Sequence, residues 1–106
     1  MKRTDIESYI EENYPDHMDK ILLADGFEDA FMGVVESFGS EPKACYSLED
    51  CEEILCSRDN MTFEEAVEYL HFNVTQAYVG EHTPAFISVM PVSLMLGEKL
   101  PEEGVK

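Results

Sequence analysis

The stretch TFEEAVEYLHFNVTQAYVG, residues 62–80, decides the fold. Thr62 and Glu65 have the spacing of a capping box, and Gly80 is a typical C-terminal cap. Between them, apolar side chains recur at the spacing of one helical face. They are Phe63, Ala66, Val67, Leu70, Val74, Ala77 and Tyr78. This pattern predicts a long core helix over residues 62–79.

The opposite side of this helix is also partly apolar. Tyr69, Phe72 and Val79 lie there. A helix that is apolar on two sides is usually covered on both. We therefore expect either the N-terminal segment or a partner to cover this second side.

Two further helices are predicted. An apolar spacing from Ile6 to Tyr14 indicates an amphipathic helix over about residues 4–14, which Pro15 ends. Ser47 is a good N-cap for a helix over residues 47–56. That helix places Cys51 and Leu55 on one side and acidic residues on the other.

Short apolar runs over residues 21–24, 30–35, 43–46 and 83–90 predict strands. We expect the first two to form a hairpin and Gly33 to mark a bulge or close packing, with a helix over residues 28–38 as the alternative. The predicted class is α+β, a small antiparallel sheet of about four strands packed against two or three helices. One domain spans residues 1–97, and residues 98–106 form a flexible acidic tail.

Charge is the most unusual property of the sequence. There are 23 acidic and 7 basic residues, and the net charge is −16. No Lys or Arg occurs between Arg58 and Lys99. Such a chain repels nucleic acids and anionic membranes and attracts a basic protein, so we expect neither direct nucleic-acid binding nor membrane binding. The simpler interpretation is that the acidity only confers solubility.

Cysteine usage and hydropathy favour the cytoplasm. The sequence has three cysteines, an odd number, and no C-x-x-C motif, which argues against a disulfide scaffold or a zinc ribbon. The cysteines are Cys45, Cys51 and Cys56. The sequence contains no signal-peptide pattern and no apolar run of membrane-spanning length. We expect a cytoplasmic protein without a cofactor, a metal or a catalytic residue.

Acidic residues on two successive predicted helices are the first candidate site. Two adjoining helices could present carboxylates at spacings similar to those of phosphates, so this acidic surface is predicted to bind a partner. The alternative is a solvated helical face. The residues are Glu49, Asp50, Glu52 and Glu53, followed by Glu64, Glu65 and Glu68.

A second candidate is a polar cluster of Asp25, Glu28, Asp29, Asn73 and His82. The three carboxylates occupy one short loop and are of the type that binds Mg²⁺ or Ca²⁺. A histidine is the usual general base at neutral pH. The alternatives are a solvated loop and packed side chains. An amide such as that of Asn73 needs partners if it is buried, and the loops at residues 25–29 and 80–84 are candidates.

Two other arrangements carry less weight. Glu68 and His71 form one Glu-x-x-His pair, which is half of a di-iron motif, but the second half is missing. Cys45 or Cys51 could act as a nucleophile beside His82, although a buried structural cysteine is the more common case. Neither arrangement predicts a catalytic site.

Three stretches of the sequence carry a resemblance. They are DGFEDA at residues 25–30, MTFEEAVEYLHFN at residues 61–73 and AYVGEHTP at residues 77–84. Over about residues 21–90 the chain resembles a group of small uncharacterised proteins encoded by bacteriophages and prophages. The resemblance implies a bacterial cytoplasm during infection and an accessory role, and it assigns no catalytic residue.

The leading functional hypothesis is a non-enzymatic accessory protein. It would bind a basic surface of a host or phage protein, with nucleic-acid mimicry or counter-defence as specific cases. The first alternative is a small metal-assisted or His-assisted enzyme that uses the loop at residues 25–29 with His71 or His82. The second is an assembly protein that forms a homodimer through Tyr69, Phe72 and the uncharged residues 83–97.

Overall fold

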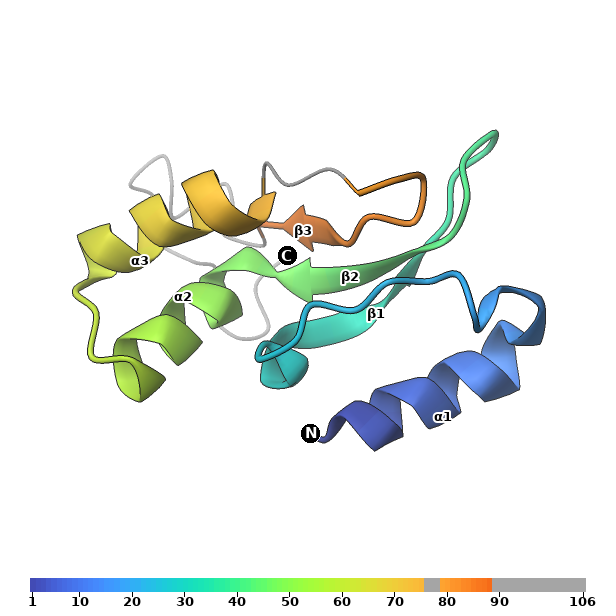
Figure 1. Cartoon of the computed structure of the whole chain (residues 1–106), viewed down its shortest axis with the longest axis horizontal. Helices are drawn as coiled ribbons and strands as arrows, with labels where there is room; N and C mark the ends of the chain where they lie inside the picture. Colours follow the sequence, from blue (N-terminus) through green and yellow to red (C-terminus); the bar gives the residue numbers. More distant parts are fainter. Residues whose placement is uncertain (76–78, 89–106) are drawn as a thin grey trace, which may run out of the picture.

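A computed structural model describes residues 1–75 and 79–88 and confirms the α+β class (Figure 1). The described part has three α-helices and a three-stranded sheet. The elements are α1 (Arg3–Asn13), β1 (Phe31–Val35), β2 (Lys43–Ser47), α2 (Leu48–Arg58), α3 (Phe63–Leu70) and β3 (Ala85–Ile87). Within residues 1–75 and 79–88, no helix is long and apolar enough to cross a membrane.

The sheet has the order β1-β2-β3, so β2 is its central strand. β1 and β2 pair antiparallel, whereas β2 and β3 pair parallel. A parallel neighbour requires a crossover, and here α2 and α3 provide it. The prediction of an antiparallel sheet with about four strands is therefore wrong in strand number, and it is right for the β1–β2 pair but wrong for the β2–β3 pair.

The missing strand is the apolar run at residues 21–24. It is an extended loop, and no strand pairs with it in the described part of the chain. Its Ala24 N–H donates instead to Tyr46 Oη, at a distance of 2.8 Å. Ile21 is buried without belonging to the sheet. Hydrophobicity alone cannot distinguish a buried extended loop from a strand, so the predicted hairpin was wrong.

The predictions for β1 and β2 are confirmed. The pairing of the two strands shifts register between Phe31 and Gly33, which is the predicted bulge, and Gly33 has a φ of +144°. The alternative helix over residues 28–38 is reduced to a single 3-10 turn, Glu28–Ala30, before the strand begins.

The three helices begin where predicted, to within one residue. In α1, the Asp5 carboxylate accepts a hydrogen bond from the Lys2 N–H. In α2, Ser47 Oγ accepts from the Asp50 N–H over 3.2 Å. In α3, Thr62 and Glu65 form the predicted reciprocal capping box. These local hydrogen bonds fix the start of each helix.

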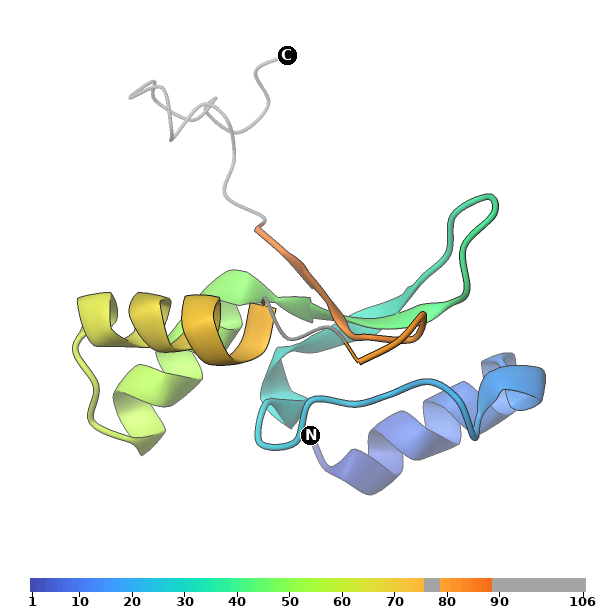
Figure 2. The ribbon, with the colours of Figure 1, turned by 45° about the horizontal axis from the view of Figure 1, so that its top comes forward.

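The end of the long helix differs from the prediction. α3 ends at Leu70 and continues as the π-helical turn His71–Thr75, while Val79 is not helical. Residues 76–78, 89–97 and the predicted tail at residues 98–106 lie outside the described part. α1 lies at the other end of the molecule and does not cover α3 (Figures 1 and 2). Phe72 is accordingly 69% exposed.

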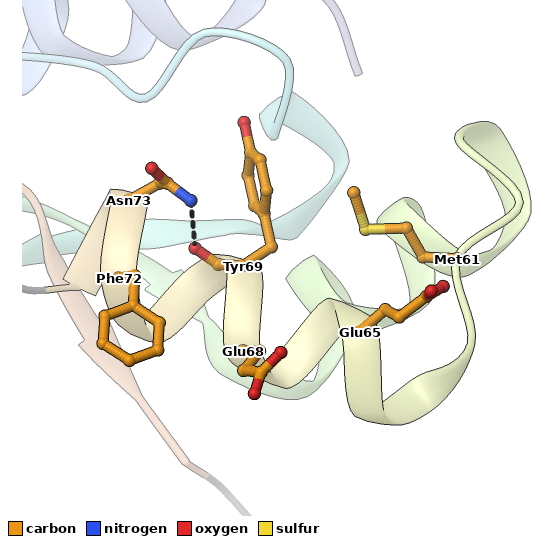
Figure 3. Close-up of a pocket in the computed structure, with 6 residues that line it drawn as sticks. All are labelled: Met61, Glu65, Glu68, Tyr69, Phe72 and Asn73. Atoms are coloured by element: carbon orange, nitrogen blue, oxygen red, sulfur yellow. Dashed lines mark hydrogen bonds between the residues drawn. The ribbon is translucent and has the colours of Figure 1, made fainter.

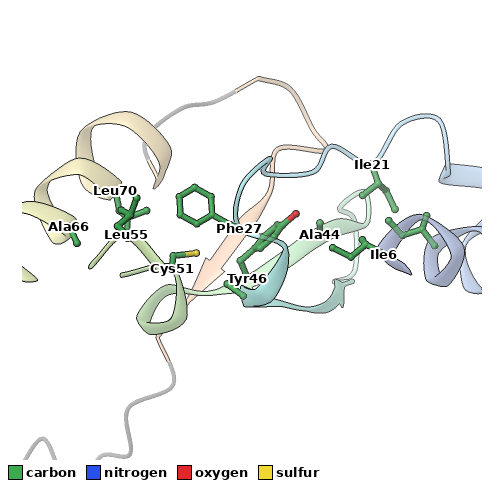
Figure 4. Close-up of a cluster of buried hydrophobic side chains, with 11 residues drawn as sticks. Ile6, Ile21, Phe27, Ala44, Tyr46, Cys51, Leu55, Ala66 and Leu70 are labelled. Atoms are coloured by element: carbon green, nitrogen blue, oxygen red, sulfur yellow. The ribbon is translucent and has the colours of Figure 1, made fainter. Parts of the chain in front are cut away.

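A continuous hydrophobic core joins the two ends of the molecule (Figure 4). Tyr46 is fully buried at its centre, where its ring meets those of Phe31 and Phe86, each at a centroid distance of 5.7 Å. Toward one end, Cys51 and Leu55 of α2 are buried together with two apolar residues of α3. Toward the other, Ile6 and Ile10 of α1 are buried near the hairpin. The α3 residues that are buried with Cys51 and Leu55 at the first end are Ala66 and Leu70.

Replacing Tyr46 by Phe tests the hydrogen bond to the loop. The Ala24 N–H would lose its acceptor in a partly buried position. We expect Tyr46→Phe to lower the free energy of unfolding by about 1–2 kcal/mol, measured by urea denaturation. Tyr9→Phe is the matched control, because Tyr9 is 40% exposed, and its effect should stay within about 0.5 kcal/mol. Equal effects of the two substitutions would contradict the role of the hydroxyl.

Candidate functional site

The predicted acidic surface lies on the outside of the α2–α3 pair. The two helices pack through their buried residues, so their carboxylates face away from the core. Residues 48–70 hold eight acidic side chains and one basic, whereas residues 1–47 hold eleven and four. The same excess of seven negative charges is therefore concentrated in half the length of chain.

Most carboxylates of this surface have no ion-pair partner in the described part of the chain. Among residues 1–75 and 79–88, no Lys or Arg forms an ion pair with Asp50, Glu52, Glu53, Glu64, Glu65 or Glu68. Two carboxylates accept hydrogen bonds, Glu49 from the Ser88 hydroxyl and Glu65 from the Thr62 N–H. Around α1 the situation differs, because Arg3 pairs with both Glu7 and Asp25. Basic groups thus neutralise part of the negative charge near α1.

An open groove of about 430 Å³ runs beside α2. Four carboxylates and the exposed ring of Phe63 line it. Partial burial, followed by the nearby charge of Glu49, raises the pKa of Glu52 above its ordinary value. Burial and the neighbouring Glu49 charge therefore both disfavour the ionised form of Glu52. The lining residues are Glu49, Asp50, Glu52, Glu53, Cys56 and Phe63.

A second open hollow of about 410 Å³ lies along α3 (Figure 3). Glu65 and Glu68 line it together with the aromatic rings of Tyr69 and Phe72. Asn73 completes it and donates a hydrogen bond of 3.2 Å to the Tyr69 carbonyl oxygen. Carboxylates and aromatic rings therefore share the solvent side of α3.

The structure brings together only part of the predicted polar cluster. In the loop at residues 25–29, Asp25 pairs with Arg3, and Asp29 pairs with the terminal amino group of Met1. Glu28 accepts a hydrogen bond from the Gly26 N–H. These three carboxylates do not form a metal-binding group among the described residues.

Asn73 and His82 have different surroundings. Asn73 lines a shallow hollow with Asp25, but its amide donates to Tyr69 and not to either loop proposed for it. His82 contacts Glu41 and His17 instead. His71 is exposed, and its ring packs against Phe72 at 5.1 Å.

His17, Glu41 and His82 form a cluster that the sequence analysis missed. His82 Nε2 lies 3.3 Å from Glu41 Oε1, and His17 Nδ1 lies 3.8 Å from the same oxygen. All three ligand atoms lie within 4.8 Å of one another. The residues are far apart in sequence and occupy three separate segments between the helices and strands, so no spacing rule could group them.

The two histidine nitrogens of this cluster lack hydrogen bonds. His17 Nδ1 and His82 Nε2 are both inaccessible to solvent, and neither has a hydrogen-bond partner among the described residues. A buried polar atom without a partner costs about 1–3 kcal/mol. Two such nitrogens close together therefore need an explanation, and a bound metal ion would provide it.

The cysteines are not arranged as nucleophiles. Cys45 and Cys51 are buried, whereas Cys56 is partly exposed. Burial raises the pKa of the Cys45 thiol. Burial, with the charges of Asp50 and Glu52, raises the pKa of Cys51 to about 12. Since the thiolate is the reactive form, both buried thiols are poor nucleophiles at neutral pH.

Comparison with known proteins assigns no family to this chain. No protein-family model matches the sequence, and neither curated proteins nor solved structures give a significant match. Function must therefore be inferred from the charge, burial and geometry of this chain.

Neutralising Glu52 tests the crowding of charge in the groove. Because its folded-state pKa is raised, the ionised carboxylate destabilises the fold above that pKa, and the penalty disappears as the pH falls toward the unfolded value of about 4.3. We expect Glu52→Gln to be more stable than the wild type at neutral pH, by less than about 1 kcal/mol, with no difference at pH 4 or below. Denaturation measured across this pH range provides the test.

The exposed Glu53 gives the matched control for this measurement. Glu53→Gln should leave the stability within about 0.5 kcal/mol of the wild type at neutral pH. A Glu52→Gln variant that is less stable than the wild type at neutral pH would contradict the described crowding.

Proposed function

We propose that this chain is a non-enzymatic binding protein whose acidic surface engages a basic surface of a host or phage protein. The surface comprises the carboxylates of α2 and α3 with the exposed rings of Phe63 and Phe72 beside them. One observation carries the proposal, namely the concentration of seven carboxylates on the outer side of two packed helices. The seven carboxylates are Glu49, Asp50, Glu52, Glu53, Glu64, Glu65 and Glu68.

Electrostatics favours a basic partner over other ligands. A net charge of −16 repels nucleic-acid phosphates and anionic lipids. A positively charged protein is attracted over a distance of about one Debye length, which increases its association rate. Basic side chains would also reduce the repulsion between neighbouring carboxylates such as Glu49 and Glu52.

The exposed aromatic rings favour Lys and Arg as the contacting groups. Phe63 is 63% exposed and Phe72 is 69% exposed, and each lies beside carboxylates. Lys and Arg have apolar stems that pack on apolar surface while their charged ends meet acidic groups. Their cations also interact favourably with aromatic faces. A surface with both features therefore suits a basic helix or loop.

The resemblance to phage and prophage proteins supplies the proposed setting. There, in the bacterial cytoplasm, the basic partner would be a protein that itself binds nucleic acid. Occupying the basic surface of that protein would make this chain a nucleic-acid mimic or a counter-defence factor. The proposed phage setting depends on the acidic surface, whereas binding of a basic partner by that surface does not depend on the phage setting.

Two charge-matched variants test the proposal. The first replaces Glu52, Glu53, Glu64 and Glu68 by Gln, which leaves the helix caps intact. The second replaces Glu11, Glu12 and Glu36 by Gln and Asp19 by Asn, all of which are exposed and distant from α2 and α3 in the sequence. Both change the net charge by four units, from −16 to −12.

Affinity capture from bacterial lysate, with identification by mass spectrometry, would provide a partner, and a titration with that purified partner would give the Kd. We expect the first variant to bind at least about tenfold more weakly and the second to change the Kd by less than about threefold. Wild-type binding should weaken strongly between about 50 mM and about 500 mM salt, where the Debye length falls from roughly 14 Å to roughly 4 Å. Equal losses for both variants, or no partner at low salt, would contradict the proposal.

A further inference from the structure

We propose that His17, Glu41 and His82 bind one divalent first-row transition-metal ion, with Zn²⁺ as the test ion. The site is separate from the acidic surface and does not depend on the proposed function. It lies near the loop end of the β1–β2 hairpin, whereas α2 and α3 lie at the opposite end of the sheet (Figure 1).

The spacing of the donor atoms suits a single ion. In a tetrahedral zinc site with bonds of about 2.0–2.1 Å, ligand atoms lie about 3.3 Å apart. His82 Nε2 and Glu41 Oε1 are 3.3 Å apart already. His17 Nδ1, 3.8 Å from the same oxygen, needs only a small side-chain movement. The two imidazole rings face the carboxylate with their centroids 6.2 Å apart.

The chemistry of the donors selects the class of ion. Two imidazoles and one carboxylate match the ligands of Zn²⁺ and its first-row neighbours, whereas Mg²⁺ and Ca²⁺ prefer oxygen ligands alone. The two nitrogens that an ion would bind are the ones that lack hydrogen bonds. A bound ion would therefore satisfy both at once.

The backbone holds the three ligands in place before an ion arrives. His17 ends the 3-10 turn Pro15–His17, and its carbonyl oxygen accepts from the Ile21 N–H at 3.0 Å. Glu41 immediately precedes the buried Pro42 at the entrance to β2. His82 lies in a turn closed by a 3.2 Å hydrogen bond from the Thr83 N–H to the Gly80 carbonyl oxygen. Ligands fixed in this way lose little entropy on binding.

Three protein ligands leave a position for water or an exogenous ligand. An open pocket of about 330 Å³ adjoins Glu41 and reaches solvent. Lys43 and Glu81 also line it, so one basic and one further acidic side chain border the pocket. The ion would in addition join three segments that are distant in sequence, including the turn that leads into β3.

Nitrogen NMR of the histidine rings in the wild-type chain gives the most direct test. The chain has three histidines, and the third, His71, is exposed. On titration with Zn²⁺ in excess Mg²⁺, we expect ring nitrogen signals of His17 and His82 to shift with one-to-one stoichiometry while those of His71 stay unchanged. Equal shifts for all three histidines, or none, would overturn the proposal.

Substitutions provide the second measurement, with Co²⁺ absorption as the readout of affinity. We expect His17→Gln and His82→Gln each to weaken Co²⁺ binding at least about tenfold, and His71→Gln to leave it unchanged. Circular dichroism checks that each variant is folded. A loss in His71→Gln equal to that in His82→Gln would overturn the proposal, and if a variant does not fold, the wild-type titration alone decides.

Discussion

The side chain of Tyr46 lies where the sheet, the N-terminal loop and the core meet. Its ring packs between Phe31 and Phe86, one from each neighbouring strand. Its hydroxyl accepts the Ala24 N–H and so holds the apolar loop at residues 21–24 against the sheet. A fully buried hydroxyl needs a partner, and this partner comes from outside the sheet. One residue therefore fixes three segments that are distant in sequence.

Both candidate sites follow from the position of β2. At its C-terminal end, Ser47 is the last residue of the strand and also the N-cap of α2, so the direction of that helix is set by the strand. At its N-terminal end, Glu41 lies two residues before the strand, beside His17 and His82. The parallel pairing of β3 brings the turn with His82 to this end of β2. The acidic surface and the histidine cluster are thus separated by the length of the sheet (Figure 1).

Features that depend on neighbouring residues were predictable from the sequence. The helix starts, the bulge at Gly33 and the strand over residues 43–46 all follow from local hydrogen bonding and hydrophobic pattern. The loop at residues 21–24 was mistaken for a strand because its backbone partner is a tyrosine hydroxyl 22 residues away. The histidine cluster was missed for a similar reason, since its members meet only when β3 pairs with β2. The acidic surface was predictable in composition, because seven carboxylates fall on two successive helices.

The arrangement of charge explains why the acidic surface is the stronger candidate for recognition. Acidic residues also occur around α1, but there Arg3 and the terminal amino group of Met1 pair with carboxylates and attach the helix to the loop at residues 25–29. On α2 and α3, Glu65 caps its own helix and Glu49 accepts from the Ser88 hydroxyl, whereas no Lys or Arg in the described part of the chain pairs with the remaining carboxylates of the surface. Their mutual repulsion opposes folding, and a basic partner would relieve it.

Chemical-shift mapping with a Lys-rich and Arg-rich peptide at low salt tests this distinction most directly. The account predicts that the largest changes in backbone amide signals occur in α2 and α3, around Glu53, Phe63 and Glu68. Amides of α1, such as those of Glu11 and Glu12, should change little. Changes of equal size on α1 and on the α2–α3 pair would contradict the account, because the peptide would then be responding to net charge and not to a particular surface.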